Sequence, residues 1–177
     1  MKKRFLHTFF VLFVLLITRS GFSQTVTKDS LLTSGIDTTI KVRPANPKAD
    51  AIISYAKTFL GVPYRYGGTT PSGFDCSGFI NYIFGNFGFS LVRTSYGLAE
   101  LGETIKLSDI QPGDLMFFKG SNVNSTAVGH VAMVVEVTPS AIKFIHSANG
   151  GVRIDNFKTS EYYIRRYVKT KRLDYGG

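Results

Sequence analysis

The sequence contains three side chains that suit nucleophilic catalysis, namely its only cysteine, Cys76, and two histidines, His130 and His146. Cys76 lies in the motif Asp-Cys-Ser-Gly-Phe at residues 75–79, where a glycine-rich loop gives way to a helical pattern. Unpaired backbone N–H groups and the helix dipole stabilise an anion at a helix N-terminus, so we expect a lowered thiol pKa. A buried, inert cysteine is the structural alternative.

A cysteine nucleophile requires a base within hydrogen-bond reach, and that base requires a third group that orients it. His130 opens a predicted strand over residues 131–137, and His146 ends the next predicted strand, over residues 141–146. A hairpin of these strands sets both imidazoles on one face. We predict that His130 forms an ion pair with the thiolate and later protonates the leaving amine, while His146 orients His130. Taken singly, either histidine is more simply a structural strand residue.

The sequence contains no motif for a different kind of catalytic site. A single cysteine excludes a cysteine-rich zinc site, and no spacing supplies a third metal ligand beside His130 and His146. The sequence also lacks a glycine-rich phosphate loop and a paired-carboxylate motif. We therefore expect neither a metal nor another cofactor.

The elements that position these residues follow a helix-then-strand order. Apolar residues at helical spacing predict helices over residues 49–60 and 75–87, and a shorter one at about 96–101. After a turn at 111–114, β-branched and aromatic segments predict strands over residues 115–118, 131–137, 141–146, 152–154 and 164–169. This order predicts an α+β domain whose N-terminal helices pack on a mainly antiparallel sheet.

The basic C-terminal segment has a simple structural interpretation. We predict that it forms an edge strand and tail whose charges face water. Its members are Arg165, Arg166, Lys169, Lys171 and Arg172.

Residues 1–23 have the pattern of a secretory signal peptide, with basic residues at positions 2–4 and an apolar stretch at 9–17. The stretch is too short for an ordinary transmembrane helix. We predict cleavage after Ser23, with an uncleaved anchor as the alternative. Residues 24–48 are predicted to form a flexible linker, and residues 49–173 a single domain.

Loss of the signal peptide removes four basic residues and lowers the formal charge from +9 to +5. An exported basic protein suits an anionic cell-wall polymer, although mild basicity can equally serve solubility alone. Nucleic acid is not an expected partner outside the cytoplasm. We expect a monomer in the periplasm or cell envelope, or a secreted one, that meets the membrane only through its signal peptide.

The order of five segments resembles that of the NlpC-type cell-wall cysteine peptidases. The segments are residues 60–68, 75–79, 112–115, 129–131 and 144–146. The resemblance covers about residues 49–167, and Asp-Cys-Ser-Gly-Phe with a downstream Gly-His-Val is its most specific part. It implies a reduced papain-like fold and hydrolysis of peptidoglycan stem peptides.

The resemblance also implies individual roles. It assigns the nucleophile to Cys76, the base to His130 and the orienting residue to His146. It places Tyr64 beside the nucleophile, where the hydroxyl would complete an oxyanion hole with the backbone N–H of Cys76. Packing within the loop is the alternative for Tyr64.

Three further side chains are candidate substrate contacts. Asp75 and Ser77 flank the nucleophile, although capping of the following helix explains Asp75 equally well. Arg93 has a planar guanidinium that matches a substrate carboxylate.

These features favour an exported cysteine endopeptidase that cleaves the γ-D-glutamyl–diamino acid bond of the stem peptide through a thioester at Cys76. A D,D-endopeptidase acting on the crosslink is one alternative. An amidase or acyltransferase on the same fold is another, because the fold alone does not fix the reaction. A wall-binding protein without activity is the third, and the intact set of one cysteine and two histidines argues against it.

Overall fold

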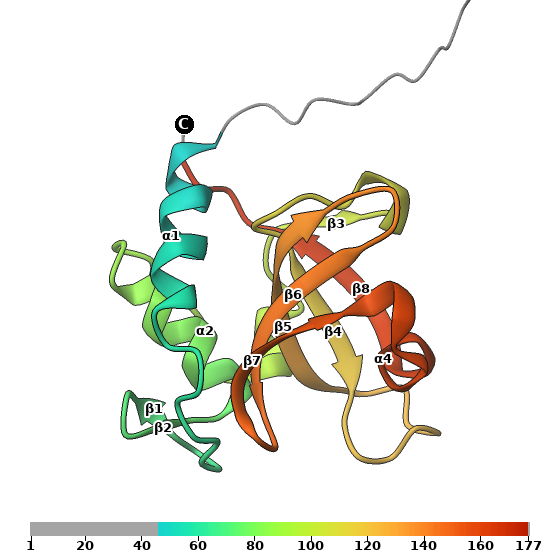
Figure 1. The fold of residues 1–177 in the computed structure, drawn as a ribbon, viewed down its shortest axis with the longest axis horizontal. Coiled ribbons are helices and arrows are strands. Elements are labelled where there is room, and N and C mark those ends of the chain that lie inside the picture. The colour runs from blue at the N-terminus through green and yellow to red at the C-terminus, as the bar shows by residue number, and fades with distance from the viewer. Residues whose placement is uncertain (1–45, 177) are drawn as a thin grey trace, which may run out of the picture. The chain divides into compact units, whose positions relative to one another are not determined.

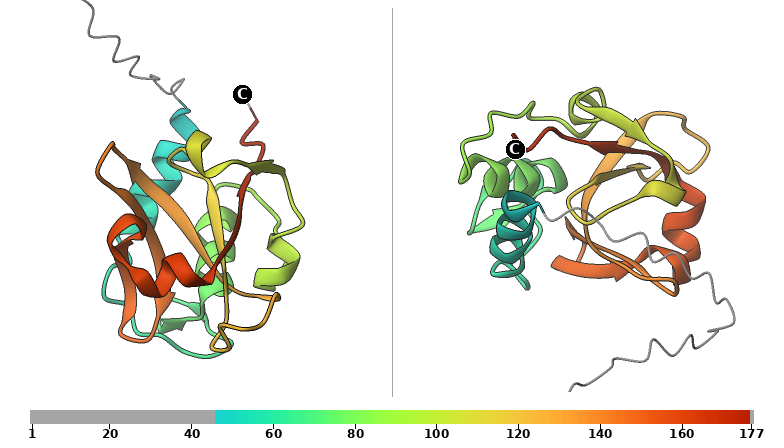
Figure 2. Two further views of the ribbon diagram at one scale, coloured as in Figure 1. Left: turned by 90° about the vertical axis from the view of Figure 1, so that its right-hand side faces the viewer. Right: turned by 90° about the horizontal axis from the view of Figure 1, so that it is seen from above.

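The computed structural model describes residues 46–176, so the predicted signal peptide and residues 24–45 of the predicted linker lie outside the described residues. In this part of the chain, two helices pack on one face of a six-stranded sheet (Figure 1). Figure 2 shows α4 on the opposite side of the sheet from α1 and α2. The predicted α+β class is confirmed. No helix within residues 46–176 is long and apolar enough to cross a membrane.

The elements follow one another in the predicted order of helices and then strands. The helices are α1 (Pro47–Lys57), α2 (Cys76–Gly85), α3 (Ser95–Leu98) and α4 (Glu161–Arg166), with 3-10 turns η1 (Leu107–Asp109) and η2 (Phe157–Thr159). A small hairpin of β1 (Thr69–Thr70) and β2 (Gly73–Phe74) precedes α2. Across the antiparallel sheet, the strands are β3 (Glu103–Ile105), β8 (Tyr167–Arg172), β4 (Leu115–Lys119), β5 (Val128–Val137), β6 (Ile142–Ala148) and β7 (Gly151–Asn156).

Alternate residues of the sheet face two separate apolar cores, because successive side chains of a strand point to opposite faces. Towards α1 and α2, the sheet contributes the fully buried side chains of Phe117, Met133 and Ile145. On the other face, Phe118 and Phe144 pack with the residues of η2 and α4. The short C-terminal helix therefore covers a face of the sheet that would otherwise be open.

Capping residues determine where the two main helices begin. α1 starts at Pro47 rather than at the predicted residue 49, because Asn46 accepts a hydrogen bond from the N–H of Ala49 and proline is favoured in the first turn. α2 starts at Cys76 because Asp75 is its N-cap. All three predicted helices end two or three residues earlier than expected, at residues 57, 85 and 98.

The predicted strand over residues 164–169 is wrong in its first half. Residues 164–166 lie in α4, where Glu161 and Arg165 form an i,i+4 ion pair at 3.1 Å and Tyr163 is buried in the second core. The aromatic and β-branched run at 162–164 suggested a strand, but tertiary packing selects the helix. The following strand, β8, is interior rather than an edge, because β3 pairs on its outer side.

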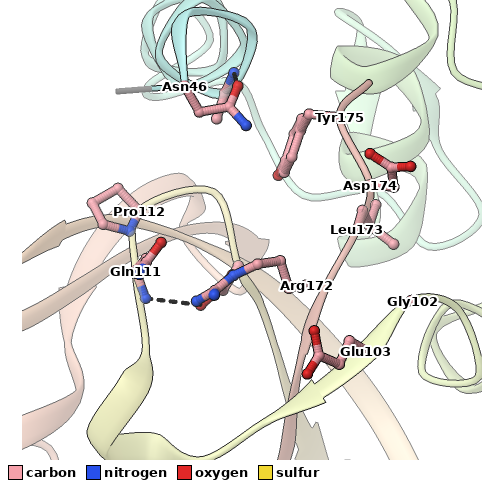
Figure 3. Close-up of a pocket in the computed structure, with 11 residues that line it drawn as sticks. Asn46, Gly102, Glu103, Gln111, Pro112, Arg172, Leu173, Asp174 and Tyr175 are labelled. Atoms are coloured by element: carbon pink, nitrogen blue, oxygen red, sulfur yellow. Dashed lines mark hydrogen bonds and ion pairs between the residues drawn. The ribbon is translucent and has the colours of Figure 1, made fainter. Parts of the chain in front are cut away.

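The prediction that the charges of this segment face water is also wrong for Lys171 and Arg172. Lys171 is buried, and its Nζ donates to the backbone oxygen of Gly102 at 3.0 Å. Arg172 donates from Nε and Nη2 to the buried carboxylate of Asp114, at 2.7 and 2.8 Å. Figure 3 shows Arg172 reaching towards the turn at Gln111, in a pocket of about 380 Å³ that Cys76 and the histidines do not line. The motif Pro-Gly-Asp-Leu at 112–115 therefore serves to join β4 to β8.

The loop before the nucleophile packs closely on the first turn of α2. Gly78 lies against the backbone oxygen of Gly68, and a Cβ atom at Gly78 would overlap that oxygen. At the other end of the same helix, a Cβ atom at Gly85 would meet nothing within 4 Å. Glycine in the motif Asp-Cys-Ser-Gly-Phe is therefore required by the close approach of the loop.

We expect Gly78→Ala to lower the free energy of unfolding by about 1–3 kcal/mol, because the added methyl group displaces the loop. The matched variant Gly85→Ala should be neutral or stabilising by up to about 1 kcal/mol, because alanine is the better helix former. Urea denaturation followed by circular dichroism measures both changes. Equal stabilities of the two variants would contradict the close packing at Gly78.

Candidate active site

Cys76 is held at the start of α2 by contacts on both sides of the chain. The Oδ1 atom of Asp75 accepts a hydrogen bond from the N–H of Gly78 at 2.6 Å and so caps the helix. The buried hydroxyl of Ser147 donates to the backbone oxygen of Phe74 at 2.7 Å, which ties the segment before the nucleophile to β6. The position of the sulfur atom is therefore fixed relative to the strand that carries His146.

Burial favours the neutral form of the Cys76 thiol. Burial is the largest influence and raises the pKa of the thiol above its ordinary value, and the charge of Asp75 raises it further. Backbone N–H groups of Val131, Ser77 and Cys76 itself act in the opposite direction. The predicted lowering of the thiol pKa is wrong in its net direction, because desolvation outweighs the donors at the helix terminus.

A chain of hydrogen bonds leads from His130 through His146 to Asp155. The Nε2 atom of His130 lies 2.9 Å from Nδ1 of His146, and Nε2 of His146 lies 2.9 Å from Oδ2 of Asp155. His146 is fully buried. The prediction that the hairpin sets the two imidazoles side by side is confirmed, because β5 and β6 are adjacent antiparallel strands.

The pKa values of these three residues favour two neutral imidazoles beside an ionised carboxylate. Burial, with a smaller contribution from His146, lowers the pKa of His130 to about 3. Burial also lowers the pKa of His146, although its hydrogen bond with Asp155 opposes this effect. The hydrogen bond from His146 and the nearby Arg153 lower the pKa of Asp155 to about 2. Burial of both groups thus favours a neutral thiol and a neutral imidazole over the predicted thiolate–imidazolium ion pair.

When both rings are neutral, only one placement of the ring protons allows both hydrogen bonds to form. The carboxylate of Asp155 can only accept, so His146 must carry its proton on Nε2. Its Nδ1 then has a free lone pair and must accept from Nε2–H of His130. The Nδ1 atom of His130 is left with a lone pair, which is the form that a general base requires.

Two further side chains hold Asp155 in place. Arg153 donates from Nε to Oδ2 of Asp155 at 3.0 Å and from Nη2 to the hydroxyl of Tyr163 at 3.1 Å. That hydroxyl lies 3.5 Å from Nε2 of His146. Burial raises the pKa of Tyr163, so its proton is retained. Arg153 and Tyr163 thus help to hold Asp155 and His146 in position.

Asp155 is not among the predicted site residues, although the sequence contains a signal for it. Residues 149–150 are Asn-Gly, which is a strong signal for a two-residue hairpin turn. The observed register from Ala148↔Gly151 continues to His146↔Arg153 and Phe144↔Asp155. This register sets Asp155 diagonally across from His146 on the same face of the sheet.

Cys76 and His130 line two neighbouring pockets rather than forming a direct hydrogen bond. Within residues 46–176, the structure contains no hydrogen bond between the thiol and the imidazole, and Cys76 lies instead against the backbone of Val131. One pocket, of about 420 Å³, contains Cys76, and the other, of about 250 Å³, contains His130. Tyr64 and Gly129 line both pockets, so the two form one cleft. Catalytic hydrogen bonds are often long before substrate binds, so this geometry suits a base that engages the thiol during attack.

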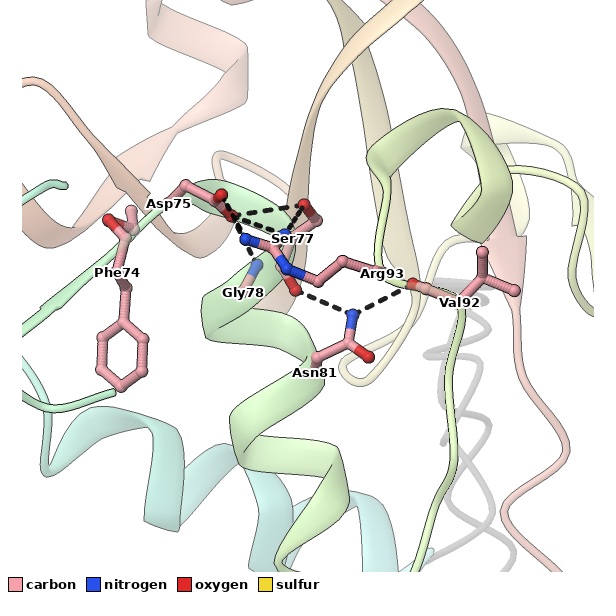
Figure 4. A network of polar contacts seen from close by, with 8 residues as sticks. Phe74, Asp75, Ser77, Gly78, Asn81, Val92 and Arg93 are labelled. Carbon is pink, nitrogen blue, oxygen red and sulfur yellow. Dashed lines mark hydrogen bonds and ion pairs between the residues drawn. The ribbon is translucent and has the colours of Figure 1, made fainter. Parts of the chain in front are cut away.

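The three candidate substrate contacts form a network with one another (Figure 4). Arg93 donates to the two carboxylate oxygens of Asp75 at 3.1 and 2.6 Å, and to the hydroxyl of Ser77 at 2.8 Å. Arg93, Asp75 and Tyr64 all line the Cys76 pocket, so Tyr64 lies beside the nucleophile as predicted. Because Asp75 already neutralises Arg93, binding of a substrate carboxylate by Arg93 stays a prediction.

The described residues offer no alternative metal centre. No group of three or more histidine, cysteine or acidic side chains that could hold a metal ion occurs in residues 46–176.

An α+β fold with a cysteine at a helix N-terminus and a histidine pair on adjacent strands defines a papain-like cysteine hydrolase architecture. The sequence profile of the NlpC/P60 family matches residues 61–172, and the chain belongs to this family. A solved NlpC/P60 family protein from Bacillus cereus superposes with a TM-score of 0.63 at 34% identity, covering 73% of this chain and 40% of that one.

Two relatives with assigned activities are similar to this chain. The gamma-DL-glutamyl hydrolase of Bacillus subtilis is 34% identical over 78% of this chain, which spans 33% of the relative. The murein DD-endopeptidase MepS/murein LD-carboxypeptidase of Escherichia coli is 30% identical over 75% of this chain, and 66% of that relative is covered. The chain therefore spans only about a third of the Bacillus subtilis relative, and the activity of the whole protein is a proposal.

We expect Asp155→Asn to reduce kcat on the order of 10- to 100-fold with little change in KM, because an amide at this position no longer enforces the proton on Nε2 of His146. The exposed Asp174, which lies outside the cleft, provides the matched control Asp174→Asn. Steady-state kinetics and urea denaturation are measured for both variants. A loss of rate that merely follows a loss of stability would contradict the positioning role.

The pKa shifts of Cys76 and His130 predict how the thiol reacts at different pH values. Because burial raises the pKa of the thiol, the rate of its alkylation by iodoacetamide should keep rising in the alkaline range where an ordinary thiol is already ionised. Because the pKa of His130 is lowered, a preformed ion pair should not maintain a fast rate in the acid range. Mass spectrometry of the modified protein measures the rate. A fast rate that does not change from acid to neutral pH would contradict the neutral resting pair.

Proposed function

We propose that the protein is an exported cysteine endopeptidase that hydrolyses peptidoglycan stem peptides. The observation that carries this proposal is the hydrogen-bonded series from Asp155 through His146 to His130, which leaves an unprotonated ring nitrogen on a residue that lines the cleft containing Cys76. Membership of the NlpC/P60 family and the peptidase and hydrolase activities of its relatives support it. Export rests on the predicted signal peptide alone.

The proposed reaction begins with transfer of the thiol proton of Cys76 to Nδ1 of His130 as the sulfur attacks the amide carbonyl carbon. The tetrahedral oxyanion is stabilised by the backbone N–H of Cys76 and by the hydroxyl of Tyr64. Burial and the nearby Cys76 raise the pKa of Tyr64, so the hydroxyl keeps the proton that it must donate. His130 then protonates the leaving amine, the carbon–nitrogen bond breaks, and a thioester remains on Cys76.

Water completes the reaction by reversing the roles of these groups. His130 accepts a proton from the attacking water, the thioester carbon–sulfur bond breaks, and the thiolate takes the proton back. His146 does not touch the substrate and acts by orienting His130, while Asp155 fixes the ring proton of His146.

We propose the γ-D-glutamyl–diamino acid bond as the substrate bond. The similarity to a gamma-DL-glutamyl hydrolase favours a γ-linked acyl group. The similarity to a murein DD-endopeptidase supports the crosslink as the second candidate. An amidase would instead release the whole stem from the sugar, and a wall-binding protein would cleave nothing.

Digestion of purified muropeptides and crosslinked dimers, followed by liquid chromatography and mass spectrometry, separates these outcomes. We expect fragments that end in γ-D-glutamate, and a loss of at least about 10³-fold in rate for Cys76→Ala. Unfolding midpoints of both proteins show that the variant is folded. Conversion of dimers to intact monomers would instead identify the D,D bond. Equal hydrolysis by Cys76→Ala would contradict the enzyme proposal.

A further inference from the structure

The pocket that contains His130 has a distinct chemical character. Aromatic side chains form much of its wall, including those of Phe118, Tyr162 and Tyr163. Two cationic side chains, Lys119 and Arg166, also line it, and none of its lining residues is acidic. The pocket therefore combines hydrophobic surface with an uncompensated positive charge.

Neither cation is neutralised by an acidic side chain within residues 46–176. The guanidinium of Arg166 stacks over the ring of Tyr162 at 3.7 Å, and its Nη1 donates to the backbone oxygen of Tyr162. Its buried Nε has no hydrogen-bond partner. The Nζ atom of Lys119 donates only to the backbone oxygen of Val123, at 3.0 Å. By contrast, the adjacent Arg165 forms an ion pair with Glu161 at 3.1 Å.

The chemistry of the cleft determines which half of a substrate enters this pocket. The acyl half becomes attached to Cys76 and occupies the Cys76 pocket. The leaving amine receives its proton from His130, so the leaving half must lie on the His130 side of the cleft. On the proposed mechanism, the cationic pocket lies on the side of the cleft that receives the leaving half.

We propose that this pocket binds a carboxylate of the leaving diamino acid, and that Lys119 and Arg166 select stem peptides whose diamino acid carries a free side-chain carboxylate. Diaminopimelate has such a group and lysine does not. The proposal rests on the proposed peptidase function and deepens it. A charge-assisted hydrogen bond in a partly enclosed pocket is strong enough to discriminate the charged group from a neutral one of the same size.

The test uses two stem tetrapeptides that differ only in the side-chain carboxylate of diaminopimelate, which is either free or amidated. Wild-type protein should have a kcat/KM about tenfold higher on the free acid. Arg166→Gln and Lys119→Gln should each reduce this preference, because the rate on the free acid falls. The matched control Arg165→Gln removes a charge from the same helix and should keep the preference.

The outcomes distinguish this inference from the proposed function on which it rests. Equal cleavage of both tetrapeptides by the wild-type protein would overturn the subsite and leave the peptidase function intact. An equal loss of preference in Arg165→Gln and Arg166→Gln would also overturn it, because the effect would then arise from general charge. Cleavage of neither tetrapeptide would contradict the proposed function and bond themselves. The wild-type comparison decides the question even if one variant fails to fold.

Discussion

Two imidazoles that are buried beside one another in their neutral forms must share their ring protons in a way that leaves no donor or acceptor unsatisfied. A carboxylate next to one of the rings determines which ring nitrogens carry the protons, because an ionised carboxylate can only accept hydrogen bonds. In this protein Asp155 is that carboxylate, and its position makes His146 an acceptor for His130. The reactive form of His130 is therefore determined by a residue that lies two hydrogen bonds away from it.

The rest of the fold positions the three hydrogen-bonded residues His130, His146 and Asp155. Antiparallel pairing of β5, β6 and β7 brings residues from three strands onto one face. η2 and α4 cover that face with apolar side chains, which is why the imidazoles are desolvated and their pKa values are lowered. On the other face of the sheet, the packed helices hold Cys76 at the start of α2. The nucleophile and its base thus belong to two cores that meet at one cleft.

The sequence predicted the features that depend on local pattern. Periodicity located both main helices and the β5–β6 hairpin, and the motif around Cys76 placed the cysteine at a helix start. The features that it did not predict depend on tertiary context. The direction of the thiol pKa follows from burial, the helical state of residues 164–166 follows from the packing of Tyr163, and the importance of Asp155 follows from strand register. Each of these needs the position of another element before it can be inferred.

The proposed mechanism depends on a neutral resting imidazole at His130, with its proton on Nε2 and its lone pair on Nδ1. Nitrogen-15 NMR of the imidazole rings, recorded at neutral pH on the folded protein, measures this directly, since protonated and unprotonated ring nitrogens have different chemical shifts. We expect a proton on Nε2 and none on Nδ1 for both His130 and His146. A proton on Nδ1 of His130, whether alone or with one on Nε2, would contradict it.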